Sequence, residues 1–254
     1  MVTLGLPRLI EQYQIDFTII NAENAAAGYG VTRKTADELF AAGADCLTTG
    51  NHVWAPKEAL ELLDRHPDIL RPANFAPGVP GRGSALYEAK NGAKVGVINL
   101  IGRVFMDPAD CPFRRGDDEV TRLKEEAQVI IVDFHAEATS EKQALGYYFD
   151  GRVSAVIGTH THVCTCDERL LPRGTAYITD CGMTGPDDTV IGIDREIALR
   201  RFLSGMPVRF DVPKHARASL SGVLVEVCLD KKGAKDIQRI SLDMSEGESD
   251  RVEV

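Results

Sequence analysis

The sequence predicts an α/β protein, and two features of the chain support that fold class. Short apolar, β-branched runs alternate with helical stretches along most of the chain, as in proteins whose strands are linked by helices. The strands lack a strict polar alternation, which is typical of sheets covered on both faces. The 254 residues can bury a large core without disulfide bonds. We expect one domain over residues 1–245 and an acidic, flexible tail over 246–254.

The first expected element is a helix over residues 3–13, which leads into a strand over 16–20 and is apolar at Leu4, Leu6, Leu9 and Ile10. The segment 103–128 is expected to be irregular. The other expected elements are, in chain order, a helix over 32–42, a strand over 45–49, a helix within 50–65, strands over 94–102 and 129–134, a helix within 135–149, a strand over 154–158, a short apolar run over 176–180, and antiparallel strands over 221–229 and 236–244.

The composition excludes several classes of protein. The formal net charge is −9, and a chain without a basic block does not coat a nucleic-acid backbone by charge alone. The sequence contains no apolar run near the roughly 18 residues that span a bilayer, and its amino end lacks a secretory signal pattern. Six scattered cysteines are typical of reduced thiols. We therefore expect a cytoplasmic protein without a membrane partner, and the oligomeric state stays open, a homo-oligomer included.

Four of the apolar runs end in polar residues of the kinds that bind metal ions. Ligands of open α/β sheets bind beyond the carboxyl ends of strands, so the loops after these runs should converge. In His160-x-His162 an extended backbone would place both imidazoles on the same face. The four segments are Asn21-Ala-Glu23-Asn24, Gly50-Asn51-His52, Asp133-Phe-His135 and Gly158-Thr-His160-Thr-His162.

The mixture of ligand types favours a two-metal hydrolytic site. Imidazole with carboxylate and amide oxygen suits iron, manganese or zinc better than calcium or magnesium. A carboxylate such as Glu23 can bridge two ions, which then hold a hydroxide for in-line attack and neutralise the developing charge on a phosphoryl group. Each motif alone has a simpler explanation, since a strand-end histidine is often structural and Asn51 beside Gly50 could serve a turn. The four motifs together, each at a strand end, favour the metal site.

Cys164 and Cys166 extend the alternation beyond His162, a pattern that also suggests a tetrahedral zinc site. The alternative is that the strand has turned by Val163, so that both thiols only pack. We favour the alternative, because a zinc site made of these four side chains would leave the other three motifs without a purpose.

The segments NAEN, GNHVW, RVFMDP, DFHAEATSEK, GTHTHV and YITDCGMTGP together resemble the YmdB-type bacterial metallophosphoesterases, a branch of the calcineurin-like superfamily. The resemblance extends from about residue 6 to about residue 205, and DFHAEATSEK is its most specific segment. It implies a four-layer α/β/β/α sandwich around a dinuclear site. Iron or manganese is the implied metal, with zinc or magnesium as alternatives. The implied activity is a phosphodiesterase acting on small phosphodiesters such as 2',3'- or 3',5'-cyclic nucleotides.

The resemblance also assigns a role to each matching residue. His52 would stabilise the transition state or protonate the leaving oxygen, and Asn24 would lie at the edge of the site near the substrate. Five residues would hold metal: Glu23 as the bridging carboxylate, Asn51, His135 and His160 on one ion, and His162 on the other.

The sequence departs from that family at its amino end. Family members begin with a strand ending in Gly-Asp, whose aspartate ligates the ion shared with Glu23 and His162, whereas this chain starts inside the helix that follows the strand. The strand should be central in its sheet, so its loss would expose the backbone of both neighbours. We expect that Met1 is not the natural start and that the strand lies upstream. The alternative is a truncated, weakly metal-binding, non-enzymatic regulator that binds a nucleotide or RNA.

Overall fold

The computed structural model describes residues 1–213, 217–230, 233–244 and 252–253, and the described strands form three sheets. In the largest sheet the middle strands run parallel, so their carboxyl ends meet at one edge. This sheet has the order β4-β5-β6-β7-β9-β8, with β4 at Ser84–Glu88, β5 at Lys94–Ile101, β6 at Val129–His135, β7 at Ala155–Thr159, β8 at Arg169–Leu170 and β9 at Ala176–Ile178.

Two smaller sheets pack on one face of the six-stranded sheet. Their apolar side chains meet the residues of β6 and β7 that point inward, Ile131 and Ala155 among them. The first small sheet is parallel and consists of β1 (Ile19–Asn21), β2 (Cys46–Thr48) and β3 (Ile69–Leu70). The second is antiparallel and consists of β10 (Gly185–Pro186), β11 (Ala218–Cys228), β12 (Gly233–Asp243) and β13 (Val252–Glu253).

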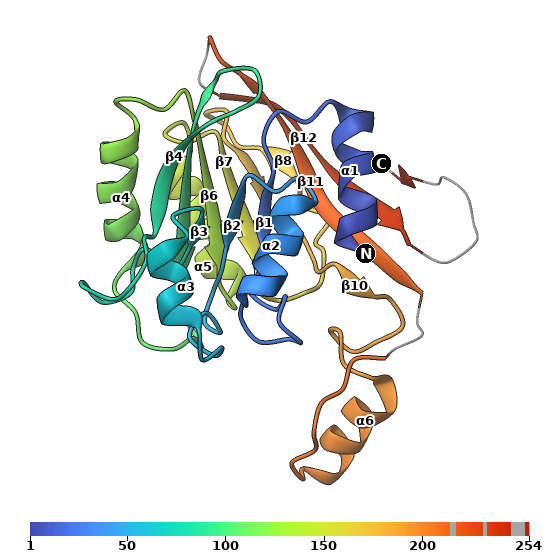
Figure 1. Ribbon diagram of the computed structural model, residues 1–254. Coiled ribbons are helices and arrows are strands. Elements are labelled where there is room, and N and C mark those ends of the chain that lie inside the picture. Colours follow the sequence, from blue (N-terminus) through green and yellow to red (C-terminus); the bar gives the residue numbers. More distant parts are fainter. Residues whose placement is uncertain (214–216, 231–232, 245–251, 254) are drawn as a thin grey trace.

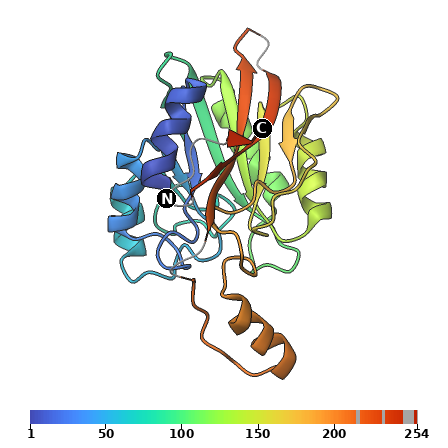
Figure 2. The same ribbon diagram turned by 90° about the vertical axis from the view of Figure 1, so that its right-hand side faces the viewer.

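Helices cover the two outer faces, which confirms the predicted α/β/β/α order of layers (Figures 1 and 2). On the six-stranded side, α4 (Pro112–Leu123) and α5 (Thr139–Phe149) bury Val120 and Leu145 in the largest apolar cluster. On the other side lie α1 (Val2–Tyr13), α2 (Arg33–Ala41) and α3 (Ala59–Arg65). A further helix, α6 (Arg195–Ser204), projects from the body and exposes Phe202 and Leu203.

Most expected elements are confirmed, with boundaries that differ by a few residues, but the irregular segment expected at 103–128 is wrong. Residues 112–123 form α4, which begins with Pro112 in the first turn, where its missing N–H costs nothing. Gly116 weakened the helical signal in the sequence. The packing of the two helices explains why glycine occupies this position, because a Cβ on residue 116 would lie 2.6 Å from the Phe149 ring of α5.

The remaining differences are short elements that the sequence did not reveal, namely β3, β4, β8, β10, β13 and α6. Of the expected acidic tail, Val252 and Glu253 pair with β12, and residues 246–251 and 254 lie outside the described residues. No helix in the described part of the chain is both long and apolar enough to cross a membrane.

Candidate active site

The four sequence motifs converge where β1, β2, β6 and β7 end. Asn21, the last residue of β1, donates from Nδ2 to Asp133 Oδ2 on β6 at 2.9 Å, so the loops after the small parallel sheet meet those after the six-stranded sheet. Hydrogen bonds and close contacts link all seven residues that we singled out: Glu23, Asn24, Asn51, His52, His135, His160 and His162.

Glu23 lies at the centre of this network and is almost completely buried. The main-chain N–H groups of Gly50 and His52 donate to its carboxylate, the latter at 2.5 Å. Burial nevertheless raises the pKa of Glu23 to about 8, against the lowering effect of these two hydrogen bonds. A buried carboxylate of this kind lacks a countercharge, and a bound cation would supply it.

His135 is also buried and presents one ring nitrogen to Glu23. The hydroxyl of Thr159 donates to Asp133 Oδ1 at 2.8 Å, and it lies 3.1 Å from His135 Nδ1, so this hydroxyl accepts the Nδ1 proton. The Nε2 lone pair then faces Asn51 Oδ1 at 3.2 Å and Glu23 Oε1 at 3.7 Å. Burial, followed by the charge of His160, holds the pKa of His135 well below its usual range, which keeps the imidazole in the neutral form that binds metals.

The expectation that His160 and His162 share one face of an extended strand is wrong. Strand β7 ends at Thr159, and the two histidines have φ values of 104° and 67° in a turning loop. His160 Nδ1 lies 3.0 Å from His135 Nε2, whereas Asn24 Nδ2 donates to His162 Nε2 at 3.0 Å. The two imidazoles therefore contact different members of the network.

His52 occupies the open side of the site. Its Nδ1 lies 3.1 Å from Asn24 Oδ1 and 3.6 Å from Glu23 Oε1, and 35% of its side chain is exposed. Tyr29 packs edge-on against the His52 ring with a centroid distance of 4.9 Å. Partial burial lowers the pKa of His52. The ring is thus oriented by the protein and still accessible to a substrate.

Residues that hold this network in place were missed as functional by sequence reasoning. Asp133 accepts hydrogen bonds from Asn21, Thr48 and Thr159, and through Thr159 it orients His135. Asp133 and Asn21 lie in the strand-end motifs, and this position was the one signal in the sequence that could have identified them. Nothing in the sequence indicated Thr48.

A buried ion pair holds the loop between His160 and His162. Lys142 Nζ lies 2.6 Å from Asp180 Oδ2, and both side chains are 1% exposed. The same Asp180 oxygen accepts from the main-chain N–H of Thr161 at 3.0 Å and from its hydroxyl at 2.8 Å. Asp180 therefore fixes the residue between the two histidines.

Replacement of Asp180 by asparagine should destabilise the protein, because it leaves the Lys142 ammonium buried without a countercharge. We expect the free energy of unfolding in urea to fall by about 3–5 kcal/mol. The double variant Lys142→Met/Asp180→Asn, which removes both charges, should recover most of that loss. A single variant as stable as the parent would show that the ion pair is not the main support of this loop.

The donor atoms at the centre of the site fit a transition metal. Within the described residues, no three His, Cys, Asp or Glu side chains already surround a common point as ligands of one ion. The imidazoles instead contact one another and the neighbouring amides. However, His135 Nε2, Asn51 Oδ1 and Glu23 Oε1 face one another as electron-pair donors, and carboxylate, imidazole and amide oxygen together suit iron, manganese or zinc.

Cys164 and Cys166 are both exposed, free thiols. The favoured alternative is confirmed in that the strand has turned before Val163, since β7 ends at Thr159. The exposure of the two thiols differs from the packing that we expected. The zinc site is not supported, since no group of metal-binding side chains in the described ranges includes them.

Comparisons with known proteins place the site in context. The family model described as YmdB-like protein matches residues 1–240. The chain is 50% identical over 240 residues to the 2',3'-cyclic-nucleotide 2'-phosphodiesterase of Bacillus subtilis, covering 94% of this chain and 90% of that protein. A hypothetical protein from Thermus thermophilus superposes with a TM-score of 0.88 at 40% identity, covering 95% and 92% of the two chains. A novel phosphatase from Mycoplasma pneumoniae superposes with a TM-score of 0.88 at 38% identity, and the match covers 95% of this chain and 87% of that one.

Proposed function

The chain belongs to the YmdB-like protein family, and on that basis we propose that it is a metal-dependent phosphodiesterase acting on cyclic nucleotides. The observation that carries the proposal is the cluster of Glu23, Asn51, His52 and His135 at the converging strand ends, in a chain half identical to a protein named as a cyclic-nucleotide phosphodiesterase. The net charge of −9 means that the countercharge for a phosphate must be local, as a metal site provides.

We propose that the site holds two ions, iron or manganese in the first place and zinc or magnesium as alternatives. The neutral His135 and the buried Glu23 carry the donor atoms that support this proposal. When bound, the metal activates water as the nucleophile and neutralises charge on the phosphoryl group. The proposed ligands are Glu23 as the bridge, Asn51, His135 and His160 on one ion, and His162 on the other.

In this proposal the side chains of the protein orient the substrate and move the proton. His52, on the open side, protonates the leaving oxygen or stabilises its charge. Asn24 connects His52 with His162 and lies at the edge where the substrate enters. Behind them, the Asp133–Thr159 pair fixes the His135 ring, so that the donor atoms need not reorganise during the reaction.

We further propose that residues 1–245 act as one domain and that the protein works in the cytoplasm. The free cysteines Cys46, Cys111, Cys164, Cys166, Cys181 and Cys228 support that compartment, because thiols stay reduced there.

The proposal predicts that the purified protein, supplied with Mn²⁺, hydrolyses a 2',3'-cyclic nucleotide and that a chelator abolishes the reaction. Product analysis by ³¹P NMR identifies the ester bond that breaks, since cleavage of the 2' ester leaves a 3'-phosphate. A 3',5'-cyclic nucleotide serves as the second substrate. Nucleotide binding without hydrolysis of either compound would instead favour the non-enzymatic binding protein.

A further inference from the structure

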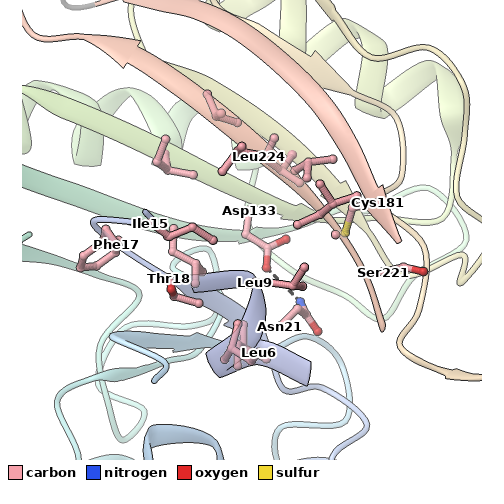
Figure 3. Close-up of a pocket in the computed structure, with 18 of the residues that line it drawn as sticks. Leu6, Leu9, Ile15, Phe17, Thr18, Asn21, Asp133, Cys181, Ser221 and Leu224 are labelled. Atoms are coloured by element: carbon pink, nitrogen blue, oxygen red, sulfur yellow. Dashed lines mark hydrogen bonds between the residues drawn. The ribbon is translucent and has the colours of Figure 1, made fainter. Parts of the chain in front are cut away.

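Two surfaces adjoin the candidate active site, and the first is a cavity of about 790 Å³ between the two small sheets, which has the size of a ligand pocket. Figure 3 shows it between Leu224 of β11 on one side and Thr18 and Asn21 on the other, with Asp133 facing it from β6. Its lining includes neither His52 nor any residue of the loop that follows β5. The open side of the site around His52 is therefore a second, separate surface.

The proposed role of His52 determines which of the two surfaces receives the nucleoside. In a 2',3'-cyclic nucleotide the leaving oxygen belongs to the ribose, and the base is attached to the same sugar ring. A ribose whose oxygen is protonated by His52 lies against the open side of the site. The base then extends over the surface next to His52 and not into the cavity.

The loop between β5 and α4, residues 102–111, begins directly beside the site. Ile101, the last residue of β5, pairs in register with His135, and Gly102 N donates to His135 O at 3.0 Å. A Cβ at Gly102 would lie 2.7 Å from the Cβ of Ala136, so glycine is needed for this close approach. The loop therefore leaves the sheet at the same edge as the metal-ligand motifs.

Hydrogen bonds hold both ends of this loop. The buried carboxylate of Glu141 accepts from the main-chain N–H groups of Arg103 at 3.1 Å and Val104 at 3.2 Å. At the other end, Asp110 N donates to Asn74 O at 2.8 Å, and the Asn74 side chain donates back to Asp110 O at 2.9 Å. The tip between these anchors is thus held in position by the protein itself.

The tip of the loop lies near His52. Burial and the charge of His162 lower the pKa of His52, whereas the Asp107 carboxylate raises it, so Asp107 is close enough for its charge to act on the imidazole. Phe105 stands two positions before Asp107 in the same tip. Tyr29, in the loop after β1, packs against the His52 ring and remains exposed. Two loops therefore bring an aromatic residue each to the open side of the site.

Phe105 has an unfavourable environment for its residue type. Its side chain is 89% exposed, the highest value among the large apolar side chains of the described residues. Its φ of 60° lies in the left-handed region, which is strained for a bulky residue with a Cβ. Neither packing nor backbone conformation accounts for a phenylalanine at this position. A ligand with a flat apolar face would account for the ring.

We propose that Phe105 stacks on the base of the nucleotide substrate and binds the nucleoside on the His52 side of the site. This assignment rests on the proposed phosphodiesterase function. An aromatic side chain can stack on any base, because every base has a π face. Phe105 thereby selects cyclic nucleotides over cyclic phosphodiesters that lack a base.

The kinetic test compares two substrates that share the same cyclic phosphate ring. Adenosine 2',3'-cyclic phosphate carries a base, whereas glycerol 1,2-cyclic phosphate does not. In the full chain supplied with Mn²⁺, Phe105→Ala should raise the KM for the adenosine compound roughly 5- to 100-fold and leave kcat nearly unchanged. The same variant should hydrolyse the glycerol compound with the parent kcat/KM. Phe105→Trp, which keeps an aromatic ring, should retain a KM close to that of the parent.

Phe202→Ala is the matched control, because it removes a ring that is 80% exposed on α6, the helix that projects from the body (Figure 1). This control should keep the parent KM for both substrates. A parent KM for the adenosine compound in Phe105→Ala would overturn the proposal. An equal rise in KM for both substrates would also overturn it, because the effect would then not involve the base.

Binding measurements separate this proposal from the proposed activity. Calorimetry in the presence of Mn²⁺ compares adenosine 3'-phosphate with glycerol phosphate, its counterpart without a base. The parent should bind the adenosine compound more tightly, and Phe105→Ala should lose that difference, even if the parent hydrolyses neither cyclic compound and the proposed activity fails. Hydrolysis by the parent, together with equal binding of adenosine 3'-phosphate by parent and variant, would overturn the role of Phe105 alone. A parent without any preference for the adenosine compound would overturn it as well.

Discussion

Replacement of His52 by alanine is expected to lower the turnover of a 2',3'-cyclic nucleotide by roughly 10²–10⁴-fold while leaving metal content nearly unchanged. The imidazole lies on the open side of the site, 3.6 Å from Glu23 Oε1, and His52 is not one of the proposed metal ligands. Its removal therefore takes away proton transfer or charge stabilisation without removing a metal donor. Turnover is measured under saturating substrate, and metal content by elemental analysis of the same sample.

His66→Ala is the matched control for this prediction, because His66 lies at the end of α3, away from the network of the site. It should hydrolyse the substrate at the parent rate. If His52→Ala also matches the parent rate, His52 has no part in the mechanism. A large loss of metal in His52→Ala would instead make it a ligand.

Replacement of Glu23 by alanine is expected to abolish hydrolysis and metal binding together, because a bridging carboxylate serves both ions. In the structure this carboxylate lies next to the Nε2 lone pair of His135 and accepts from two main-chain N–H groups. Elemental analysis and turnover are measured on the same preparation. Retention of two ions per chain in Glu23→Ala would contradict the bridging role.

Glu23→Gln separates loss of metal from loss of fold. The side chain of glutamine carries no charge, and its single amide oxygen can accept from only one of the two N–H groups, because Gly50 and His52 donate to different oxygens of Glu23. Because burial raises the pKa of Glu23 to about 8, the metal-free parent must take up a proton at this position when it folds near neutral pH, which costs stability that the uncharged glutamine does not lose. This gain offsets the loss of one hydrogen bond in the variant. The metal-free Gln variant should therefore still fold and unfold at a urea concentration close to that of the metal-free parent, and yet bind metal poorly.

The convergence of the site could be predicted from the sequence because it follows from local signals and one general rule. Apolar runs end at Asn21, Thr48, His135 and Thr159, and parallel strands place their carboxyl ends at a common edge. Once the strands were located, the loops that carry Glu23, His52 and His160 had to meet. Predicting the α/β/β/α order of the layers required the family resemblance as well, because the alternation of strands and helices along the chain indicates only an α/β protein.

The parts that sequence reasoning missed depend on contacts between residues far apart in the chain. Lys142 and Asp180 are separated by 38 positions in the chain. The two residues become buried only when α5 packs against the loop after β9, so the sequence around each of them does not indicate burial. The backbone of His160 and His162 turns because Asp180 holds Thr161, which the alternating pattern of the motif conceals. Helix α4 likewise depends on Gly116 fitting against Phe149.

The most direct test of the proposal that this protein is a metal-dependent phosphodiesterase is a titration of the chelator-treated protein with Mn²⁺. The amount of bound Mn²⁺ and the rate of 2',3'-cyclic nucleotide hydrolysis are measured on the same samples. The proposed two-metal site predicts no hydrolysis without metal, and a rate that rises with occupancy to a plateau near two ions per chain. Undiminished hydrolysis by the metal-free protein, or no hydrolysis at full occupancy, would contradict it.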